Sequence, residues 1–163
     1  MTSSPTFRTP APLRGVALGV SYEQHQVIRN LDVDIPAGQV TVIIGPNGCG
    51  KSTLLRALSR LLAPDAGQVL LHGRDVRGYG SKELACQLGL LPQAPVAPHG
   101  ICVAELVRQW SPEDERAVSQ AMHETGIADL AGRGVDELSG GQRQRVWLAM
   151  ALAQETPLLL LDE

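Results

Sequence analysis

The sequence predicts an α/β fold, in which strands and helices alternate along the chain. Residues 15–35 show the alternation of apolar and polar residues that is typical of strands, and later strand-like runs alternate with segments of helical spacing. A glycine-rich loop near residue 50 follows a predicted strand and precedes a predicted helix. The chain has 163 residues, of which 44% are hydrophobic, so it can bury the core of one domain or of a large part of one.

The first strands predict an antiparallel start. Residues 15–22 and 27–35 are expected to be strands, and 39–45, "QVTVIIG", is expected to be a third because it follows a turn at Pro36 to Gly38. Apolar residues at helical spacing predict the helices, and Ser139 is a suitable N-cap for the last one. The remaining expected helices cover 51–62, 81–87, 103–125 and 139–154. The helical segment 103–125 is expected to be interrupted near Ser111-Pro112, where the proline suits the first turn of a helix. The remaining expected strands cover 68–73, 88–93 and 158–161.

Composition limits the functional classes. A formal net charge of −3 without a basic run argues against nucleic acid held by bulk electrostatics. The three cysteines show no CxxC spacing, which favours a reducing compartment over a disulfide framework or zinc site. Residues 1–14 contain three prolines and are expected to be a flexible tail. No apolar run approaches the roughly 18 residues that cross a bilayer, so a membrane role requires a partner.

The stretch "GPNGCGKST" matches the G-x-x-x-x-G-K-[ST] phosphate loop in the expected context, after a strand and at the start of a helix. Glycines let backbone N–H groups surround an anion, and Lys51 neutralises β- and γ-phosphate charge. The Ser52 hydroxyl suits Mg²⁺. Cys49 is interpreted as a tolerated small residue. The predicted nucleotide-binding residues here are Gly45, Pro46, Asn47, Gly48, Cys49, Gly50, Lys51, Ser52 and Thr53.

Two later motifs accompany this loop. "LSGGQRQR", at 138–145, is by itself a helix N-cap with a flexible entry, and "PLLLLDE" is by itself a buried strand that ends in two acids. Together with the phosphate loop, in this order and spacing, they make the chain resemble the nucleotide-binding subunit of an ATP-binding cassette (ABC) transporter. The fold that this resemblance implies is a P-loop NTPase of the ABC type, with a RecA-like core, an N-terminal antiparallel part and a helical signature subdomain at about 94–142 within a domain at 15–163.

The resemblance implies further site residues. Two such domains are expected to dimerise head to tail, so that the signature of one meets the ATP γ-phosphate on the other. Asp162 resembles the Mg²⁺-holding acid, and Glu163 the general base. Gln93 resembles a catalytic glutamine that touches Mg²⁺ and senses the membrane partner. Tyr22 resembles the aromatic residue that stacks on adenine, and the alternative is a tyrosine of the core or the surface. The signature residues implied are Ser139, Gly140, Gly141 and Gln142; Arg143 and Arg145 are interpreted as solvated or interfacial charges.

Within this family, "LGLLPQAPVAPHGICVAELV" and the stretch from Ser111 to Glu163 resemble ATPases of ferric siderophore importers, with haem and cobalamin importers as the alternative. The resemblance implies ATP and Mg²⁺ as cofactors. It implies permease subunits as direct partners and a substrate-binding protein as an indirect one. It also implies a location at the cytoplasmic face of the membrane. The sequence departs from the family by an apparent loss of residues near Val107-Arg108. It also stops where relatives continue with another strand, so we expect a fragment truncated after its acidic pair.

Two other functional hypotheses remain open at this stage. A truncated chain could bind nucleotide without hydrolysing it. A soluble ABC ATPase that acts on DNA or ribosomes is disfavoured, since the spacing between the motifs is too short for a long coiled-coil insertion and the chain lacks room for two cassettes.

Overall fold

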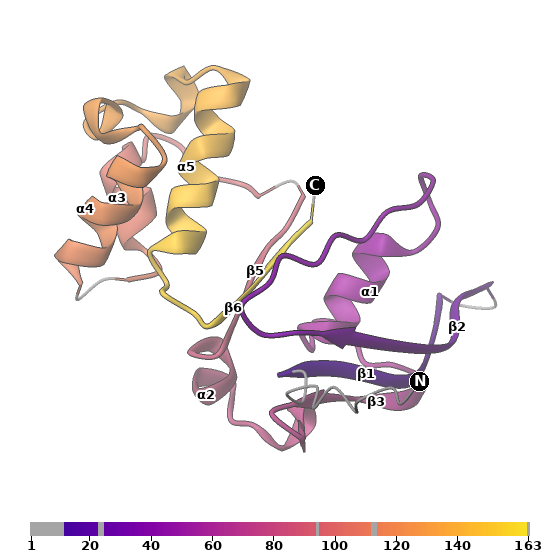
Figure 1. Cartoon of the computed structure of the whole chain (residues 1–163). Helices are drawn as coiled ribbons and strands as arrows, with labels where there is room; N and C mark the ends of the chain where they lie inside the picture. Colours follow the sequence, from indigo (N-terminus) through magenta and orange to yellow (C-terminus); the bar gives the residue numbers. More distant parts are fainter. Residues whose placement is uncertain (1–11, 23–24, 94, 112–113, 163) are drawn as a thin grey trace, which may run out of the picture. The chain divides into compact units, whose positions relative to one another are not determined.

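Antiparallel strand pairing organises the first part of the chain in the computed structural model, which describes residues 12–22, 25–93, 95–111 and 114–162 (Figure 1). Strand β1 (Leu13–Tyr22) pairs with β2 (His25–Ile35) on one side and β3 (Ala66–Leu71) on the other, and β4 (Arg74–Asp75) follows β3. The expected antiparallel start is therefore confirmed. β1 begins at Leu13, which is fully buried, two residues inside the expected tail.

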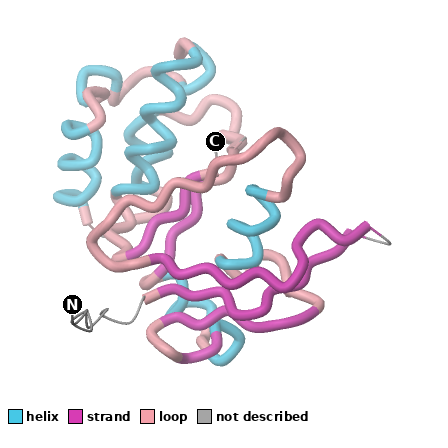
Figure 2. Tube along the Cα trace, turned by 45° about the vertical axis from the view of Figure 1, so that its right-hand side comes forward, coloured by secondary structure: helices cyan, strands magenta, loops and turns pink. Residues whose placement is uncertain are grey.

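Helix α1 (Lys51–Leu58) packs on this sheet (Figure 2). Its apolar residues at 54, 55 and 58 face the same side, as their helical spacing requires, and all three are buried. They share a core with alternating residues of the strands, since successive side chains of a strand point to opposite faces. The fully buried members of this core are Leu13, Leu18, Val20, Leu58, Val69 and Leu71.

The prediction of a strand at 39–45 is wrong for this structure. Residues 40–46 belong to no strand, and no described strand pairs with them. The side chains of Val40, Val42 and Ile44 are 92%, 73% and 86% exposed. Consecutive β-branched residues favour a strand, but a strand also requires a hydrogen-bonded neighbour. Without that neighbour among the described residues, the segment runs as an irregular, exposed connection into the phosphate loop.

Helix α1 also ends earlier than its leucine spacing predicts. It stops at Leu58, and Leu61, expected on its buried face, is 70% exposed. Arg60 adopts the left-handed conformation, with φ of 62°, which ends the helix. Its guanidinium donates to the carbonyls of Val76 and Tyr79, at 3.1 and 2.6 Å, and these bonds hold the chain in that turn.

Among the described residues, those from 81 onward form a second compact unit, distinct from those up to 80. The domain predicted over 15–163, with a helical subdomain at about 94–142, stays a prediction. Two strands of this unit, β5 (Leu88–Leu91) and β6 (Leu158–Leu161), pair in parallel. Its helices are α2 (Ser81–Ala85), α3 (Val103–Arg108), α4 (Glu115–Glu124) and α5 (Gly140–Leu152), with short 3₁₀ turns at Ala128–Leu130 and Val135–Glu137; a further 3₁₀ turn, Val76–Gly78, lies in the first unit.

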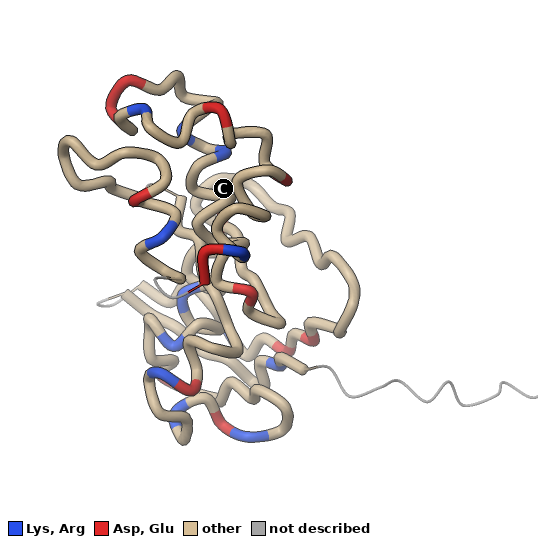
Figure 3. The backbone as a smooth tube through the Cα atoms, turned by 90° about the vertical axis from the view of Figure 1, so that its left-hand side faces the viewer, with Lys and Arg blue, Asp and Glu red and all other residues tan. Residues whose placement is uncertain are grey.

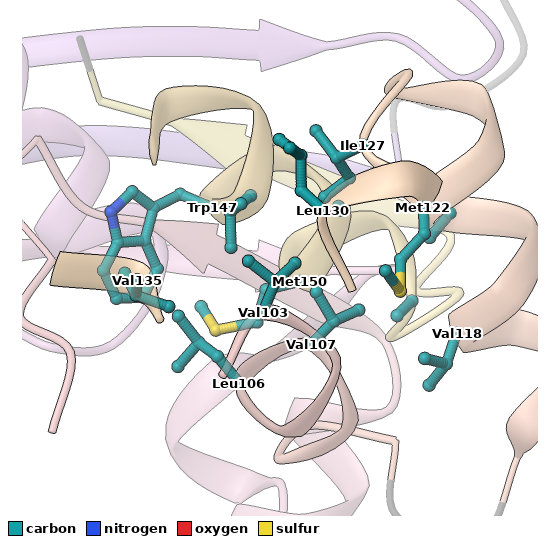
Figure 4. Packing of buried hydrophobic residues seen from close by; sticks show 14 of the residues in the cluster. Val103, Leu106, Val107, Val118, Met122, Ile127, Leu130, Val135, Trp147 and Met150 are labelled. Carbon is teal, nitrogen blue, oxygen red and sulfur yellow. The ribbon is translucent and has the colours of Figure 1, made fainter. Parts of the chain in front are cut away.

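The core of the second unit lies between α3, α4 and α5, whose apolar side chains point toward one another in Figure 4. The break between α3 and α4 confirms the interruption expected there. However, Asp114 is the N-cap of α4, and its carboxylate accepts from the N–H of Ala117 at 2.9 Å. The helix therefore does not begin at the proline, and Pro112 itself lies outside the described residues.

Charged residues of both signs are interspersed along the described chain (Figure 3). None of the helices that the structure describes is long and apolar enough to cross a bilayer. The mixture of an antiparallel sheet, a parallel strand pair and helices confirms the predicted α/β class.

Candidate functional site

The phosphate loop is shaped by its glycines and by Lys51. Gly48 and Gly50 have φ of 78° and 98°, a region that residues with a Cβ rarely adopt. The Lys51 Nζ donates to the carbonyl oxygens of Gly45 and Pro46, at 2.9 and 2.8 Å. The lysine is therefore folded back over the loop that it follows, with its ammonium group held at the loop's own backbone.

The start of α1 is suited to an anion. Gly50 is its N-cap and offers no side chain to the first N–H groups, and the first turn contains no acidic residue. The helix N-terminus then presents backbone donors and a positive dipole next to the Lys51 ammonium group. This donor set fits the phosphates of a nucleotide. Thr53, also predicted here, is only 8% exposed, so its side chain faces the core.

Cys49 lies inside the loop with its thiol 3.9 Å from Lys51 Nζ. It is exposed and forms no disulfide. A Cβ at Gly45 would lie 2.7 Å from the Cys49 sulfur, so the Cys49 side chain would have to turn away if position 45 carried a side chain.

A pocket of about 260 Å³ lies beside the phosphate loop. It is bounded by β2 on one side and by the segment from Ile43 to Leu54 on the other. Val27 packs closely on Gly50, since a Cβ on that glycine would meet the Val27 side chain at 2.8 Å. Sequence reasoning missed Val27, Arg29 and Ile43 as pocket residues, because no motif marks them and only the fold brings β2 to the loop. Tyr22 is 43% exposed and is not among the lining residues.

The second unit carries the other predicted residues. Parallel pairing places Leu91 opposite Leu161, and the backbone N–H of Asp162 donates to the Leu91 carbonyl at 3.0 Å. Gln93 and Asp162 therefore follow the carboxyl ends of neighbouring strands, at the same sheet edge. Gln93 is exposed and Asp162 half-buried. The predicted base, Glu163, lies outside the described residues.

The predicted N-cap of the last helix is confirmed. The Ser139 hydroxyl accepts from the N–H of Gln142 at 3.3 Å, while the Gln142 side-chain oxygen accepts from the N–H of Ser139 at 3.0 Å. This reciprocal capping box fixes the first turn of α5. A Cβ built on Gly140 or Gly141 would meet nothing within 4 Å, so this turn presents an open face of backbone to an incoming anion.

The two arginines after the signature, interpreted from the sequence as solvated or interfacial charges, are exposed and each donates to a backbone carbonyl. Arg143 is exposed and donates to the Leu138 carbonyl at 3.3 Å. Arg145 donates to the Gly126 carbonyl at 3.2 Å, which ties α5 to the turn after α4. Both side chains thus stabilise the position of the helix that Ser139 begins.

The predicted site residues fall into two groups. Tyr22 and the phosphate loop belong to the first unit, whereas Gln93, the Ser139 turn and Asp162 belong to the second. The oxygen donors of Ser52, Gln93 and Asp162 are of the type that Mg²⁺ prefers. Among the described residues, no group of three or more His, Cys, Asp or Glu side chains forms a metal site on its own.

Comparison with known proteins shows which family the chain resembles. The family model described as "ABC transporter" matches residues 28–163. The chain is 53% identical to the ferric enterobactin transport ATP-binding protein FepC of Escherichia coli, over 94% of this chain and 60% of that protein. It is 51% identical to the probable siderophore transport system ATP-binding protein YusV of Bacillus subtilis, over 90% of this chain and 57% of that protein.

A solved structure of a bacterial Atm1-family ABC exporter with ATP bound matches the fold with a TM-score of 0.85 at 28% identity, over 94% of this chain and 30% of that chain. The chain therefore spans about 60% of the length of the curated relatives that it matches.

Proposed function

Because the chain belongs to the ABC transporter family, we propose that it is the ATP-binding and ATP-hydrolysing part of a subunit that powers an importer of ferric siderophores. The observation that supports this proposal most is the phosphate loop, where the Lys51 ammonium group is held at the Gly45 and Pro46 carbonyls and Gly50 offers no side chain to the first N–H groups of α1. The capped glycine turn at Ser139 would be a second anion-binding helix start, as the family's two-domain mechanism requires.

In this proposal different residues of the chain bind the phosphates, hold Mg²⁺, activate the attacking water and bind the adenine. Backbone N–H groups of the loop and the Lys51 ammonium group bind the β- and γ-phosphates. Ser52, Gln93 and Asp162 are the residues that would hold Mg²⁺, which neutralises the charge that develops on the phosphates. Glu163 would accept the proton of the attacking water, and Gln93 would orient that water. Tyr22 would stack on the adenine.

We assign the partners from the same premise. Ser139, Gly140, Gly141 and Gln142 would contact the γ-phosphate held by a second copy, so that ATP joins two subunits head to tail. The assembled pair would act on permease subunits at the cytoplasmic face of the membrane. A substrate-binding protein would be an indirect partner, because it would deliver the substrate to the permease. Closure of the two subunits around ATP would then drive the permease.

The substrate class rests on relatives. Both curated proteins reported above are named for siderophore transport, and their identity to this chain exceeds 50%. No residue of this chain is argued to touch the transported compound, so the substrate is inherited from the family. Uptake of a ferric siderophore, hemin and cobalamin into vesicles that hold the full-length subunit with its permease would test this assignment. Preferential uptake of hemin or cobalamin would contradict it.

Nucleotide binding is tested with Lys51→Ala, and Lys82→Ala is a matched control because Lys82 lies on α2, in the other unit. Loss of the ammonium group should weaken binding of a fluorescent ATP analogue by about 10-fold or more, since each 1.4 kcal/mol is tenfold. The control should bind like the unmodified protein. Equal affinity in Lys51→Ala and the unmodified protein would rule out the assigned phosphate site.

A further inference from the structure

We propose that Asp136 is a positioning residue that joins the loop after Gln93 to the turn that leads into Ser139, so that these two sites move together. This inference rests on the proposed function, because both sites belong to its mechanism. It concerns a residue outside the phosphate loop, the signature and the acidic pair.

The two segments meet through backbone hydrogen bonds. The Val135 N–H donates to the Ile101 carbonyl, and the Val103 N–H donates to the Arg133 carbonyl, both at 3.0 Å. Between these bonds, Cys102 and Gly134 form an antiparallel bridge. We call this pairing of residues 99–104 with residues 131–136 the clasp.

The clasp has a rigid base. Cys102 is the N-cap of α3, and its N–H donates to the Glu105 carboxylate at 3.1 Å. Val103 and Val107 of the same helix are fully buried in the core of the second unit. This end of the clasp is thus anchored by capping and by packing, and it has little freedom to move relative to α3.

Asp136 closes the other, exposed end. Its Oδ2 accepts from the Gly100 N–H at 3.4 Å and lies 3.5 Å from the His99 Nδ1. Gly100 has φ of 75°, which turns its N–H toward the carboxylate in a conformation that favours glycine. The side chains of Asp136 and His99 are 56% and 102% exposed. Exposed contacts of this kind contribute little to stability, so this end can open without unfolding the unit.

The clasp lies between the two sites along the chain. Asp136 is in the 3₁₀ turn Val135–Glu137, and only Glu137 and Leu138 separate it from Ser139. In the other direction, residues 95–98 form no helix or strand, so the chain from Gln93 first joins a paired segment at the clasp. A displacement of the chain at Gly100 therefore reaches the turn before Ser139 directly through Asp136 while the exposed end is closed. When this end opens, only the backbone bonds at the anchored base still join the two segments.

The test uses the full-length subunit assembled with its permease in vesicles. Asp136→Ala removes the acceptor, Asp136→Asn retains an oxygen for the Gly100 N–H, and Asp129→Ala is the control. Asp129 is an exposed carboxylate of the same unit, for which the structure shows no side-chain hydrogen bond or ion pair among the described residues. The measurements are the basal rate of ATP hydrolysis, its stimulation by loaded substrate-binding protein, KM for ATP, melting temperature, and maleimide labelling of Cys102 relative to Cys86.

We expect Asp136→Ala to lower the stimulated rate by about fivefold or more, the lower end of typical coupling between sites. The basal rate of Asp136→Ala, its KM for ATP and its melting temperature should match those of Asp129→Ala. Maleimide should label Cys102 faster, relative to Cys86, in Asp136→Ala than in Asp129→Ala. Asp136→Asn should recover most of the stimulation. The inference is overturned if Asp136→Ala is stimulated as strongly as Asp129→Ala. It is also overturned if the stimulated rate falls only because the melting temperature of Asp136→Ala is lower. If the unmodified subunit fails to bind ATP, the proposed function itself fails, and this inference with it.

Discussion

Single residues at helix starts determine much of the candidate site. Gly50 and Ser139 are the N-caps of the two helices proposed to bind phosphate, but they cap them differently. Gly50 offers no side chain to the first N–H groups of α1, whereas Ser139 uses its hydroxyl for one N–H and leaves a glycine turn open beside it. The first arrangement exposes donors to a ligand, and the second holds a helix start rigid for a surface contact.

Replacing Ser139 with alanine should have two separable effects. Loss of the N-cap hydroxyl should lower the free energy of unfolding by about 1 kcal/mol, as measured by urea denaturation. It should also weaken ATP-dependent dimerisation of the full-length subunit, measured by analytical ultracentrifugation. Ser119→Ala, on the exposed side of α4, should change neither quantity. An unchanged unfolding free energy in Ser139→Ala would show that the capping box does not stabilise α5.

Glu105 provides a pH-dependent contribution to stability. The N–H of Cys102 donates to its carboxylate and holds the pKa below the ordinary value of 4.5. A depressed folded-state pKa adds stability above the unfolded value, and this stability is lost as the pH falls through the folded value. Glu105→Gln keeps a capping side chain but cannot titrate. Its unfolding free energy should therefore fall less steeply than that of the unmodified chain below about pH 5; parallel curves would contradict this assignment.

At the scale of elements, pairing outweighs local propensity. Residues 40–46 have the composition of a strand, yet they form none because no described strand lies beside them. β5 and β6 are shorter, at four residues each, but they pair in full register from Leu88 with Leu158 to Leu91 with Leu161. A strand is thus decided by its neighbour, whereas α1 and α5 satisfy the backbone groups of their interior turns within themselves.

Truncation of Val42 and of Leu58 should change the free energy of unfolding by very different amounts, because Val42 is exposed and Leu58 is buried. Val42→Ser should change the unfolding free energy of the 163-residue chain by less than about 0.5 kcal/mol, because its side chain is 73% exposed. Leu58→Ala, at a fully buried position on α1, should cost about 2–5 kcal/mol. Thermal and urea unfolding measure both. A large cost at Val42 would mean that the segment is buried in solution.

At the scale of the whole molecule, the described residues form two units with separate cores. The cluster that contains Val103, Ile127, Val146 and Met150 lies entirely in the second unit. The phosphate loop lies in the first, and the signature turn in the second. The proposed function therefore needs both units to be folded, while their cores can be weakened one at a time.

Ile127→Ala should show this independence. The side chain is fully buried, so its truncation should cost about 2–5 kcal/mol. Hydrogen exchange followed by mass spectrometry should detect faster exchange in α3, α4 and α5, with little change in β1 and β3. Equal acceleration in both units would show that the chain unfolds as a single cooperative body.

Local interactions explain what the sequence by itself determined. The phosphate loop from Gly45 to Thr53 and the Ser139 cap depend on residues within one turn of each other, so their geometry follows from glycine conformations and nearby hydrogen bonds. The antiparallel pairing of β1 with β2 was also predictable, because the two strands are consecutive and their alternating patterns match.

Only the tertiary structure decided the features that join distant residues. Val27 reaches the phosphate loop, and residues 99–104 meet residues 131–136, through contacts that no local pattern encodes. The strand expected at 39–45 does not form because none of the described strands lies beside it, and α1 ends early because Arg60 bonds to carbonyls of a later turn, so both outcomes depend on distant residues. Local propensity specifies which structures are available, and long-range hydrogen bonds and burial select among them.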